Sequence, residues 1–408
     1  MRQGISCVLS YDISLQNVLL PSTALFSGLS WHANVAIMND SPNPFLEALA
    51  GAVLPLLYAM DALSFARQRV DPFTMPQLYE AVGDTAEPLE KALPAFRTAE
   101  WPEGEGLADF RERVETAAAG VAQAFAGLKA AAEVEGFDAL RLARRGFKGL
   151  LEAERALYPM AALSPPISGY FLSDDAREDA VLAAKLDAAA DNPHPFGGIM
   201  EQAGPDGPNG GYARYIPEFL DPSTPAPVIV ALHGGRGNGP EVLWSWLQAA
   251  RARGCVLLAP TAIGDTWAIS SDDVDSPNID RILVETEAVQ PLDRSRVLLT
   301  GMSDGGTFSY VSGLMDDSPA THLAPFAASF HSMLLEFVSP ARIADLPIRL
   351  THGGRDWMFA IDMARAAAAA FQSKFAKIDF HELPDRAHVF PVDQTAVTLD
   401  WFLGESIG

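Results

Sequence analysis

The sequence predicts an α/β architecture with a mostly parallel sheet, preceded by an all-α helical domain. Three observations lead to this prediction. From residue 197 onward, short β-rich runs alternate with helical patterns, which is typical of a parallel sheet covered by helices. Residues 38–165 show helical periodicity alone. At 408 residues, the chain is also long enough for two domains.

Three long helices are expected in the helical domain. The first covers 43–67, because Asn43 can cap a helix and Pro44 suits its first turn. The second covers 107–128, where apolar residues recur at helical spacing, and the third covers 138–157. The third helix carries a basic island, which we interpret as a solvated face or as a contact for an acidic neighbour: Arg141, Arg144, Arg145 and Lys148.

The composition of the chain changes on either side of this domain. Residues 1–37 are expected to be a weakly ordered extension, because Met38 begins a stretch that resembles a natural chain opening. Pro159, Pro165, Pro166 and the stretch 192–195 interrupt the helical pattern, so residues 166–196 are expected to form a connector to an α/β domain over 197–408. The expected strands of that domain are 212–216, 228–232, 256–259, 297–300, 327–330, 348–351 and 378–381.

Charge and cysteine content exclude several classes of protein. The net charge of -23 opposes binding to nucleic acid or to an anionic lipid surface. The only cysteines, Cys7 and Cys255, provide neither a disulfide framework nor a four-ligand zinc cluster, and they favour a cytoplasmic location. The apolar stretch 48–60 is shorter than the ~18 residues of a membrane span, so no membrane span is expected.

The most informative motif is G-x-S-x-G at Gly301, Ser303 and Gly305. It follows an apolar strand and precedes a helix that begins near Thr307, which is the context that a nucleophilic serine requires. A tight strand-to-helix turn projects the serine hydroxyl above the sheet, and the glycines relieve the crowding there.

A serine nucleophile needs a general base and an acid that orients the base. His388 is the expected base, because it lies in a turn-rich loop after a strand, whereas His381 alternates within that strand. Asp356 is the expected acid, because its loop leaves the preceding strand. Asp385 and Asp362 remain alternatives for the acid.

The developing oxyanion needs backbone N–H donors. Asp304, directly after the nucleophile, is expected to supply one. Gly234 and Gly235, in a glycine-rich loop after the strand 228–232, are the other candidates. This loop lacks the ending of a P-loop and the spacing of a dinucleotide fingerprint, so nucleotide binding is not expected.

Together these motifs resemble the α/β-hydrolase superfamily, and within it the carboxylesterase/phospholipase-like and polyhydroxybutyrate-depolymerase-like esterases. The resemblance covers about 210–402 and implies an α/β-hydrolase fold with the same nucleophile, acid and base. Phe359-Ala360 and Arg386-Ala387 depart from the family pattern. The motifs that carry the resemblance are LHGG (232–235), DRSRVLLTGMSDGG (293–306), HGGRD (352–356) and AHVFP (387–391).

The expected function is a serine hydrolase that cleaves small-molecule carboxylic esters through an acyl-enzyme, without a metal or organic cofactor. A peptidase or thioesterase with the same triad, and a catalytically silent binding protein, are the alternatives.

The acidic run 272–280 lacks the pattern of a calcium loop. The helical domain is expected to cover the site, or to bind a partner or a second copy of the chain. Candidate substrate-binding residues, which packing explains equally well, are Met302, Trp267, Trp357 and Phe359.

Overall fold

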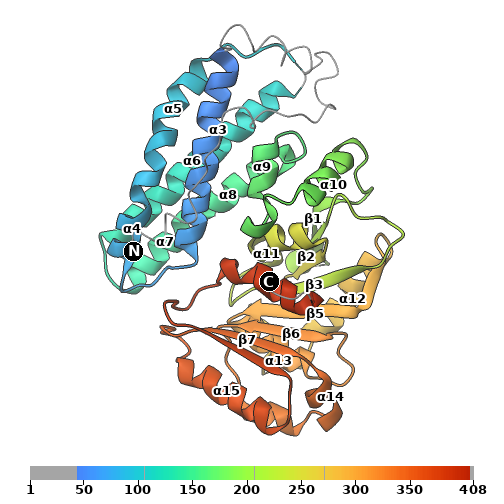
Figure 1. Cartoon of the computed structure of the whole chain (residues 1–408). Coiled ribbons are helices and arrows are strands. Elements are labelled where there is room, and N and C mark those ends of the chain that lie inside the picture. Colours follow the sequence, from blue (N-terminus) through green and yellow to red (C-terminus); the bar gives the residue numbers. More distant parts are fainter. Residues whose placement is uncertain (1–43, 105, 206, 271, 405–408) are drawn as a thin grey trace.

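The computed structural model describes residues 44–404, apart from 105, 206 and 271. It shows a helical bundle beside a sheet that helices cover on both faces (Figure 1). The expected extension 1–37 and the expected start at Met38 lie outside the described residues. The helices before the sheet are α3 (Pro44–Arg67), α4 (Met75–Val82), η2 (Gly83–Ala86), α5 (Glu87–Thr98), α6 (Leu107–Ala132), α7 (Phe137–Gly146), α8 (Lys148–Leu157), η3 (Tyr158–Met160), α9 (Pro165–Tyr170), η4 (Asp174–Ala176) and α10 (Ala180–Asp191).

The third expected helix, 138–157, is divided into α7 and α8. The division falls at Phe147, whose ψ of -10° departs from helical geometry. Gly146, just before it, packs against Gly127 of α6 so closely that a Cβ at Gly127 would lie 2.5 Å from the Cα of Gly146. This close backbone approach, which no periodicity reveals, accompanies the change of direction. The interval 166–196, expected as a connector, holds α9, η4 and α10.

Helix α3 combines length with an apolar composition. Its most apolar 18-residue window has a mean hydropathy of 1.6, enough to cross a membrane by composition alone. In the fold, however, α3 packs within the bundle, and eight of its residues are buried, from Ala52 to Ala66. The core helix of a globular bundle has the same composition, so the prediction of no membrane span stays a prediction.

The sheet has eight strands in the order β1-β2-β4-β3-β5-β6-β7-β8. β1 and β2 pair antiparallel, β2 pairs antiparallel with β4, and the remaining pairs are parallel. The strands are β1 (Gly198–Gly204), β2 (Gly207–Ile216), β3 (Ala226–Leu232), β4 (Val256–Pro260), β5 (Leu292–Met302), β6 (His322–Phe326), β7 (Ile348–Gly353) and β8 (Ile378–Leu383). The helices in this part are α11 (Gly239–Arg253), α12 (Asp275–Glu287), α13 (Asp304–Gly313), η5 (Ser332–Glu336), α14 (Pro340–Asp345), α15 (Ile361–Ser373), η6 (Val392–Gln394) and α16 (Thr395–Leu403).

One expected strand was wrong. The strand predicted over 327–330 lies earlier, as β6, and includes Pro325 opposite Gly301 of β5. Proline has no backbone N–H to donate to the hydrogen bonds of a sheet, so Pro325 made the segment 322–326 look unlike a strand in the sequence. The strand ends before Ala327, whose φ of 44° leaves the extended region.

The two faces of the sheet belong to two apolar cores. Along β3, Val228, Val230 and Leu232 face the core formed with α12 to α15, while Ile229 and Ala231 face the core formed with α11 and α16. This alternation follows from the two-residue period of a strand. The second of these cores continues without interruption into the helical bundle. The bundle and the sheet therefore share one apolar core.

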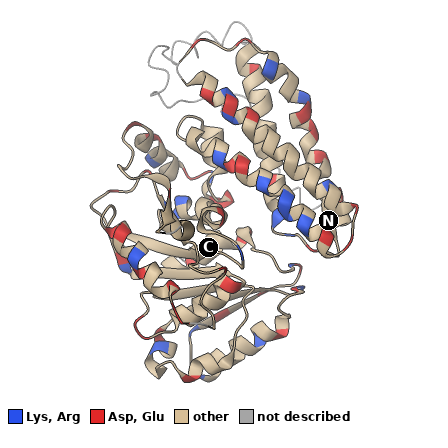
Figure 2. Cartoon of the chain, turned by 180° about the vertical axis from the view of Figure 1, so that it is seen from behind, with Lys and Arg blue, Asp and Glu red and all other residues tan. Residues whose placement is uncertain are grey.

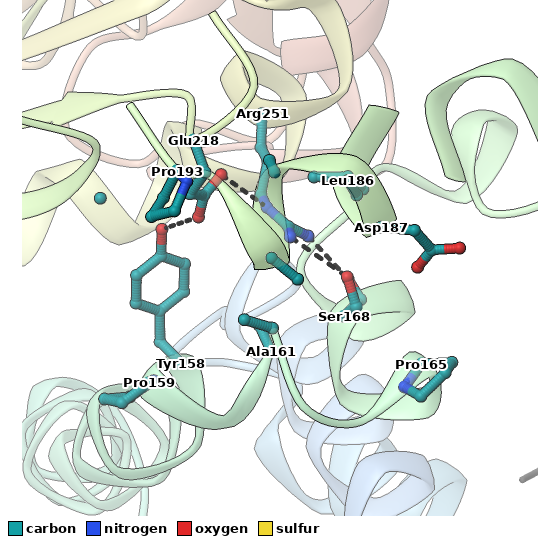
Figure 3. Close-up of a pocket in the computed structure, with 14 residues that line it drawn as sticks. Tyr158, Pro159, Ala161, Pro165, Ser168, Leu186, Asp187, Pro193, Glu218 and Arg251 are labelled. Carbon is teal, nitrogen blue, oxygen red and sulfur yellow. Dashed lines mark hydrogen bonds and ion pairs between the residues drawn. The ribbon is translucent and has the colours of Figure 1, made fainter. Parts of the chain in front are cut away.

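Aromatic side chains and a buried ion pair connect the bundle to the sheet. The ring of Tyr158 meets those of Phe171 and Trp244 edge-on, with centroids 5.2 and 5.8 Å apart. Beside them lies a cavity of about 220 Å³ (Figure 3). There Tyr158 donates a hydrogen bond to Glu218, which also pairs with Arg251 at 3.4 Å. Arg251 also donates to the backbone carbonyl of Ser168 at 3.0 Å, so this network holds the two parts together.

We expect the free energy of unfolding to fall as the pH falls from about 6.5 to 4. The rings of Trp401 and Phe402 pack around His322, and burial lowers the pKa of its imidazole from 6.5 to about 4. Between these values the unfolded chain binds the extra proton, so stability is lost on acidification. For a partly buried group the loss is about 2 kcal/mol. Urea unfolding at both pH values should show a smaller difference in His322→Gln than in wild type; equal differences would contradict the prediction.

Candidate active site

Ser303 lies on a strained turn between β5 and α13. Its φ of 57° and ψ of -118° are unusual for a residue with a side chain. Its backbone N–H donates to the carbonyl of Phe326 at 3.0 Å, which ties the turn to β6. A Cβ at Gly305 would lie 2.4 Å from the carbonyl oxygen of His233, so only glycine lets the turn approach β3 this closely. The motif therefore forms the sharp elbow that its sequence indicated.

The structure brings Ser303, His388 and Asp356 together. The Nε2 atom of His388 lies 3.1 Å from the Oγ of Ser303, and its Nδ1 lies 2.8 Å from the Oδ2 of Asp356. All three residues are buried, with 8, 4 and 7 % of their surface exposed. Because Asp356 accepts a hydrogen bond from Nδ1–H of His388, the ring proton lies on Nδ1, and Nε2 is free to accept the proton of the serine hydroxyl.

The carboxylate of Asp356 is held on both oxygens. Its Oδ1 accepts the backbone N–H groups of Met358 and Phe359, each at 2.8 Å. Burial opposes ionisation, but the hydrogen bonds from His388 and from these N–H groups outweigh it, and the pKa of Asp356 lies below its ordinary value of 3.8. Asp356 is therefore a carboxylate at neutral pH and orients the imidazole.

The glycine-rich loop after β3 lies against the elbow. A Cβ on Gly234 would lie 3.7 Å from the Cβ of Ser303, and one on Gly235 would lie 2.7 Å from the Oδ2 of Asp304. The candidate donors Gly234, Gly235 and Asp304 are thus adjacent to the nucleophile. Next to this loop lies a cavity of about 330 Å³, lined in part by Asn209, Arg236 and Asp265.

His233 and Trp267 hold the glycine-rich loop in place through hydrogen bonds. The Nε2 of His233 accepts the backbone N–H of Ala262 at 3.1 Å, so its Nδ1 carries the proton and donates to the carbonyl of Gly234 at 2.7 Å. The indole N–H of Trp267 donates to the backbone carbonyl of His233 at 2.7 Å. Burial lowers the pKa of His233, which favours the neutral ring that this arrangement needs.

For Trp267, the structure favours packing, the alternative to a contact with substrate. Its side chain is buried, with 2 % exposed, and stacks on Phe308 with ring centroids 5.4 Å apart. The remaining three candidates are partly buried. The rings of Trp357 and Phe359 meet that of His388 with centroids 5.6 and 5.4 Å apart, and Met302 directly precedes Ser303. Met302 and Trp357 both also pack against the core that the sheet shares with the bundle. Three of the four candidates therefore adjoin the site.

The alternative acids and base have other partners. The carboxylate of Asp362 pairs with Arg365 at 3.0 Å, and that of Asp385 pairs with Arg386. His381 lies 2.7 Å from Asp379. In the acidic run 272–280, Asp275 is buried and accepts backbone N–H groups of the segment that carries Trp267. This carboxylate has a structural role.

The segment that carries the serine elbow is similar to known proteins. Residues 275–400 match the Phospholipase/Carboxylesterase family. The part of the chain that carries the sheet has the α/β-hydrolase fold. This confirms the fold class and the family resemblance that the sequence indicated.

The individual proteins to which this chain is similar match limited segments of it. Feruloyl esterase C of Emericella nidulans is 31% identical over 106 residues, which are 24% of this chain and 39% of that protein. The chain thus spans well under half the length of this curated relative. Two similar solved structures are a thermostable esterase (19% identity, 51% of this chain and 62% of that one, TM-score 0.40) and esterase 2 of Thermogutta terrifontis phosphorylated by paraoxon (16% identity, 52% and 94%, TM-score 0.42).

Two contacts from the helical bundle reach the α/β-hydrolase site, and sequence reasoning missed both. Phe137 at the start of α7 meets the ring of Trp357 edge-on, with centroids 5.0 Å apart. Asp71, in the segment after α3, pairs with Arg355 at 2.9 Å. Arg355 directly precedes Asp356, so both contacts reach the loop that holds the acid. An isolated aromatic residue and an isolated carboxylate give no signal that would have revealed these contacts.

Proposed function

We propose that this chain hydrolyses carboxylic esters through an acyl-enzyme formed on Ser303. The observation that carries the proposal is the continuous relay from Asp356 through His388 to Ser303 at a strained elbow. A serine hydroxyl is a weak nucleophile by itself, and this relay supplies both a base and the group that orients the base.

In the first half of the reaction, the Oγ of Ser303 attacks the ester carbonyl while His388 takes the hydroxyl proton. The carbonyl oxygen becomes an oxyanion, which backbone N–H groups of Asp304 and of the 234–235 loop stabilise. Collapse of this intermediate breaks the bond to the alkoxide, which takes the proton from His388 and leaves as the alcohol. In the second half, His388 deprotonates a water molecule, the hydroxide attacks the acyl group, and the acid departs as the serine proton returns.

The comparisons support this reaction at the level of the domain. The matched family consists of phospholipases and carboxylesterases, and the curated relative is named as a feruloyl esterase. Apart from the ester and water, each step described above uses only groups that this chain supplies. The proposed substrate class is therefore a small carboxylic ester.

The proposal predicts both turnover and a covalent adduct. Wild-type protein should hydrolyse p-nitrophenyl esters, assayed from acetate to long acyl chains together with methyl ferulate. Paraoxon should stop this activity and add a diethylphosphoryl group to the peptide that contains Ser303, as measured by mass spectrometry. Turnover of thioesters or peptides alone would favour those reactions. No adduct and no turnover of any substrate would overturn the proposal in favour of a silent binding protein.

A further inference from the structure

A basic face on the bundle lies unexplained beside the proposed active site. In a chain of net charge -23, four cations lie between residues 141 and 148. Arg141 pairs with Asp138 at 2.9 Å. Within the part of the chain that the structure describes, the other three have no ion pair or hydrogen bond, and all are exposed: Arg144, Arg145 and Lys148. Figure 2 shows basic residues grouped on the end of the bundle that is nearest to the sheet.

Helical geometry directs part of this face toward the active site. Phe137, Arg141 and Arg144 are spaced four and three residues apart and therefore lie on one side of α7. Phe137 on that side contacts Trp357, whose ring in turn contacts that of His388. At 1.5 Å per residue, Arg144 lies about 10 Å along the helix axis from Phe137. The cations therefore begin next to the catalytic loop and continue away from it.

Apolar side chains lie between these cations and the nucleophile. Phe137 and Met358 are 59 and 48 % exposed, and Phe137 contacts Trp357, which directly precedes Met358 in the chain. Phe73, 67 % exposed, follows Asp71, whose carboxylate contacts Arg355 of the same loop. A ligand on this surface would therefore meet an apolar region near the serine and positive charge farther out.

We propose that this surface binds a monomeric ester whose apolar part lies over Phe137 and Trp357 and whose anionic group is bound by Arg144 and Lys148. The inference rests on the proposed function and specifies its substrate class. Arg144 and Lys148 are exposed and have no ion pair within the described residues, so an anionic group of the substrate can reach both side chains.

A dissolved ester fits this surface better than an anionic bilayer does. The chain as a whole carries 52 acidic against 29 basic side chains, so a large anionic surface would be repelled by most of the molecule. Asp138 adjoins the cations and would also face a bilayer. A single anionic group can reach Arg144 and Lys148 without meeting the rest of the acidic surface.

The test compares two esters that differ only in one terminal charge, p-nitrophenyl hydrogen suberate and p-nitrophenyl octanoate. The double variant Arg144→Gln/Lys148→Gln should lower the ratio of kcat/KM for suberate to that for octanoate about ten-fold, mainly through KM. High salt should lower the same ratio in wild type but not in the double variant. Lys185→Gln on α10, an exposed cation remote from the site, should leave the ratio unchanged.

Binding measurements separate this inference from the proposed reaction. Calorimetry can measure how Ser303→Ala binds octanedioic acid monomethyl ester without any turnover. If Ser303→Ala that also carries Arg144→Gln/Lys148→Gln binds this ester more weakly, the inference is supported even if no ester is cleaved. An unchanged suberate-to-octanoate ratio in the double variant would overturn it. Loss of the preference in Arg236→Gln instead would assign the anion to the glycine-rich loop. Salt-sensitive binding of wild type to phosphatidylglycerol vesicles, lost in the double variant, would replace it with a membrane contact.

Discussion

Ser303→Ala is expected to lower kcat for ester hydrolysis by about 10⁴- to 10⁶-fold. The substitution removes the atom that is proposed to form the acyl bond, and it leaves His388 without the hydroxyl that lies 3.1 Å from its Nε2. Backbone donors near Gly235 and Asp304 remain, so a residual rate above that in water is expected. Steady-state hydrolysis of p-nitrophenyl esters by the two proteins, purified in parallel, measures the effect.

The folded state should survive this change. Ser303 is small, and its side chain makes no cap hydrogen bond to α13. The circular dichroism spectrum and the urea midpoint should therefore match those of wild type. Equal kcat in a folded Ser303→Ala protein would show that another group is the nucleophile.

Asp356→Asn is expected to lower kcat by about 10⁴-fold at neutral pH. An amide has the shape of the carboxylate, but it carries no charge to stabilise the imidazolium that forms during the reaction. Where the amide nitrogen faces Nδ1 of His388, it also favours the tautomer with the proton on Nε2, which cannot accept the serine proton. A pH profile of kcat in the two proteins measures the loss.

The same substitution should change the response of stability to acid. The pKa of Asp356 in the folded protein lies below that in the unfolded chain. The ionised carboxylate therefore stabilises the fold above the unfolded pKa, and this contribution is lost as the pH falls through the folded pKa. The free energy of unfolding should thus depend less on pH below about 4 in Asp356→Asn than in wild type.

A matched control lies on the neighbouring helix. Asp362 begins α15, pairs with Arg365, and has a side chain that is 84% exposed. Asp362→Asn should retain wild-type kcat. Loss of activity in Asp362→Asn together with normal activity in Asp356→Asn would reverse the assignment of the acid.

Local patterns in the sequence were sufficient for several features. The periodicity of α6 and the alternation of strands with helices depend only on neighbouring residues. The elbow at Ser303 is likewise a short segment whose glycines leave the backbone few alternatives. His388 could be separated from His381 because one follows a strand and the other lies within it. In a parallel sheet, residues that follow successive strands meet at one edge, so chain order already predicts proximity.

Contacts between distant segments were decided only by the tertiary structure. The buried position of Trp267 depends on Phe308 and on the carbonyl of His233, neither of which is its neighbour in the chain. The contact between Phe137 and Trp357 depends on how the bundle packs onto the sheet, as does the proximity of the basic face to the site. An amphipathic pattern shows which face of a helix or strand is buried. It does not show which other helix or strand packs against that face, because apolar faces of many elements could pack there. Local patterns were therefore enough to predict Ser303 as the nucleophile and ester hydrolysis as its reaction, whereas packing decides which residues surround it.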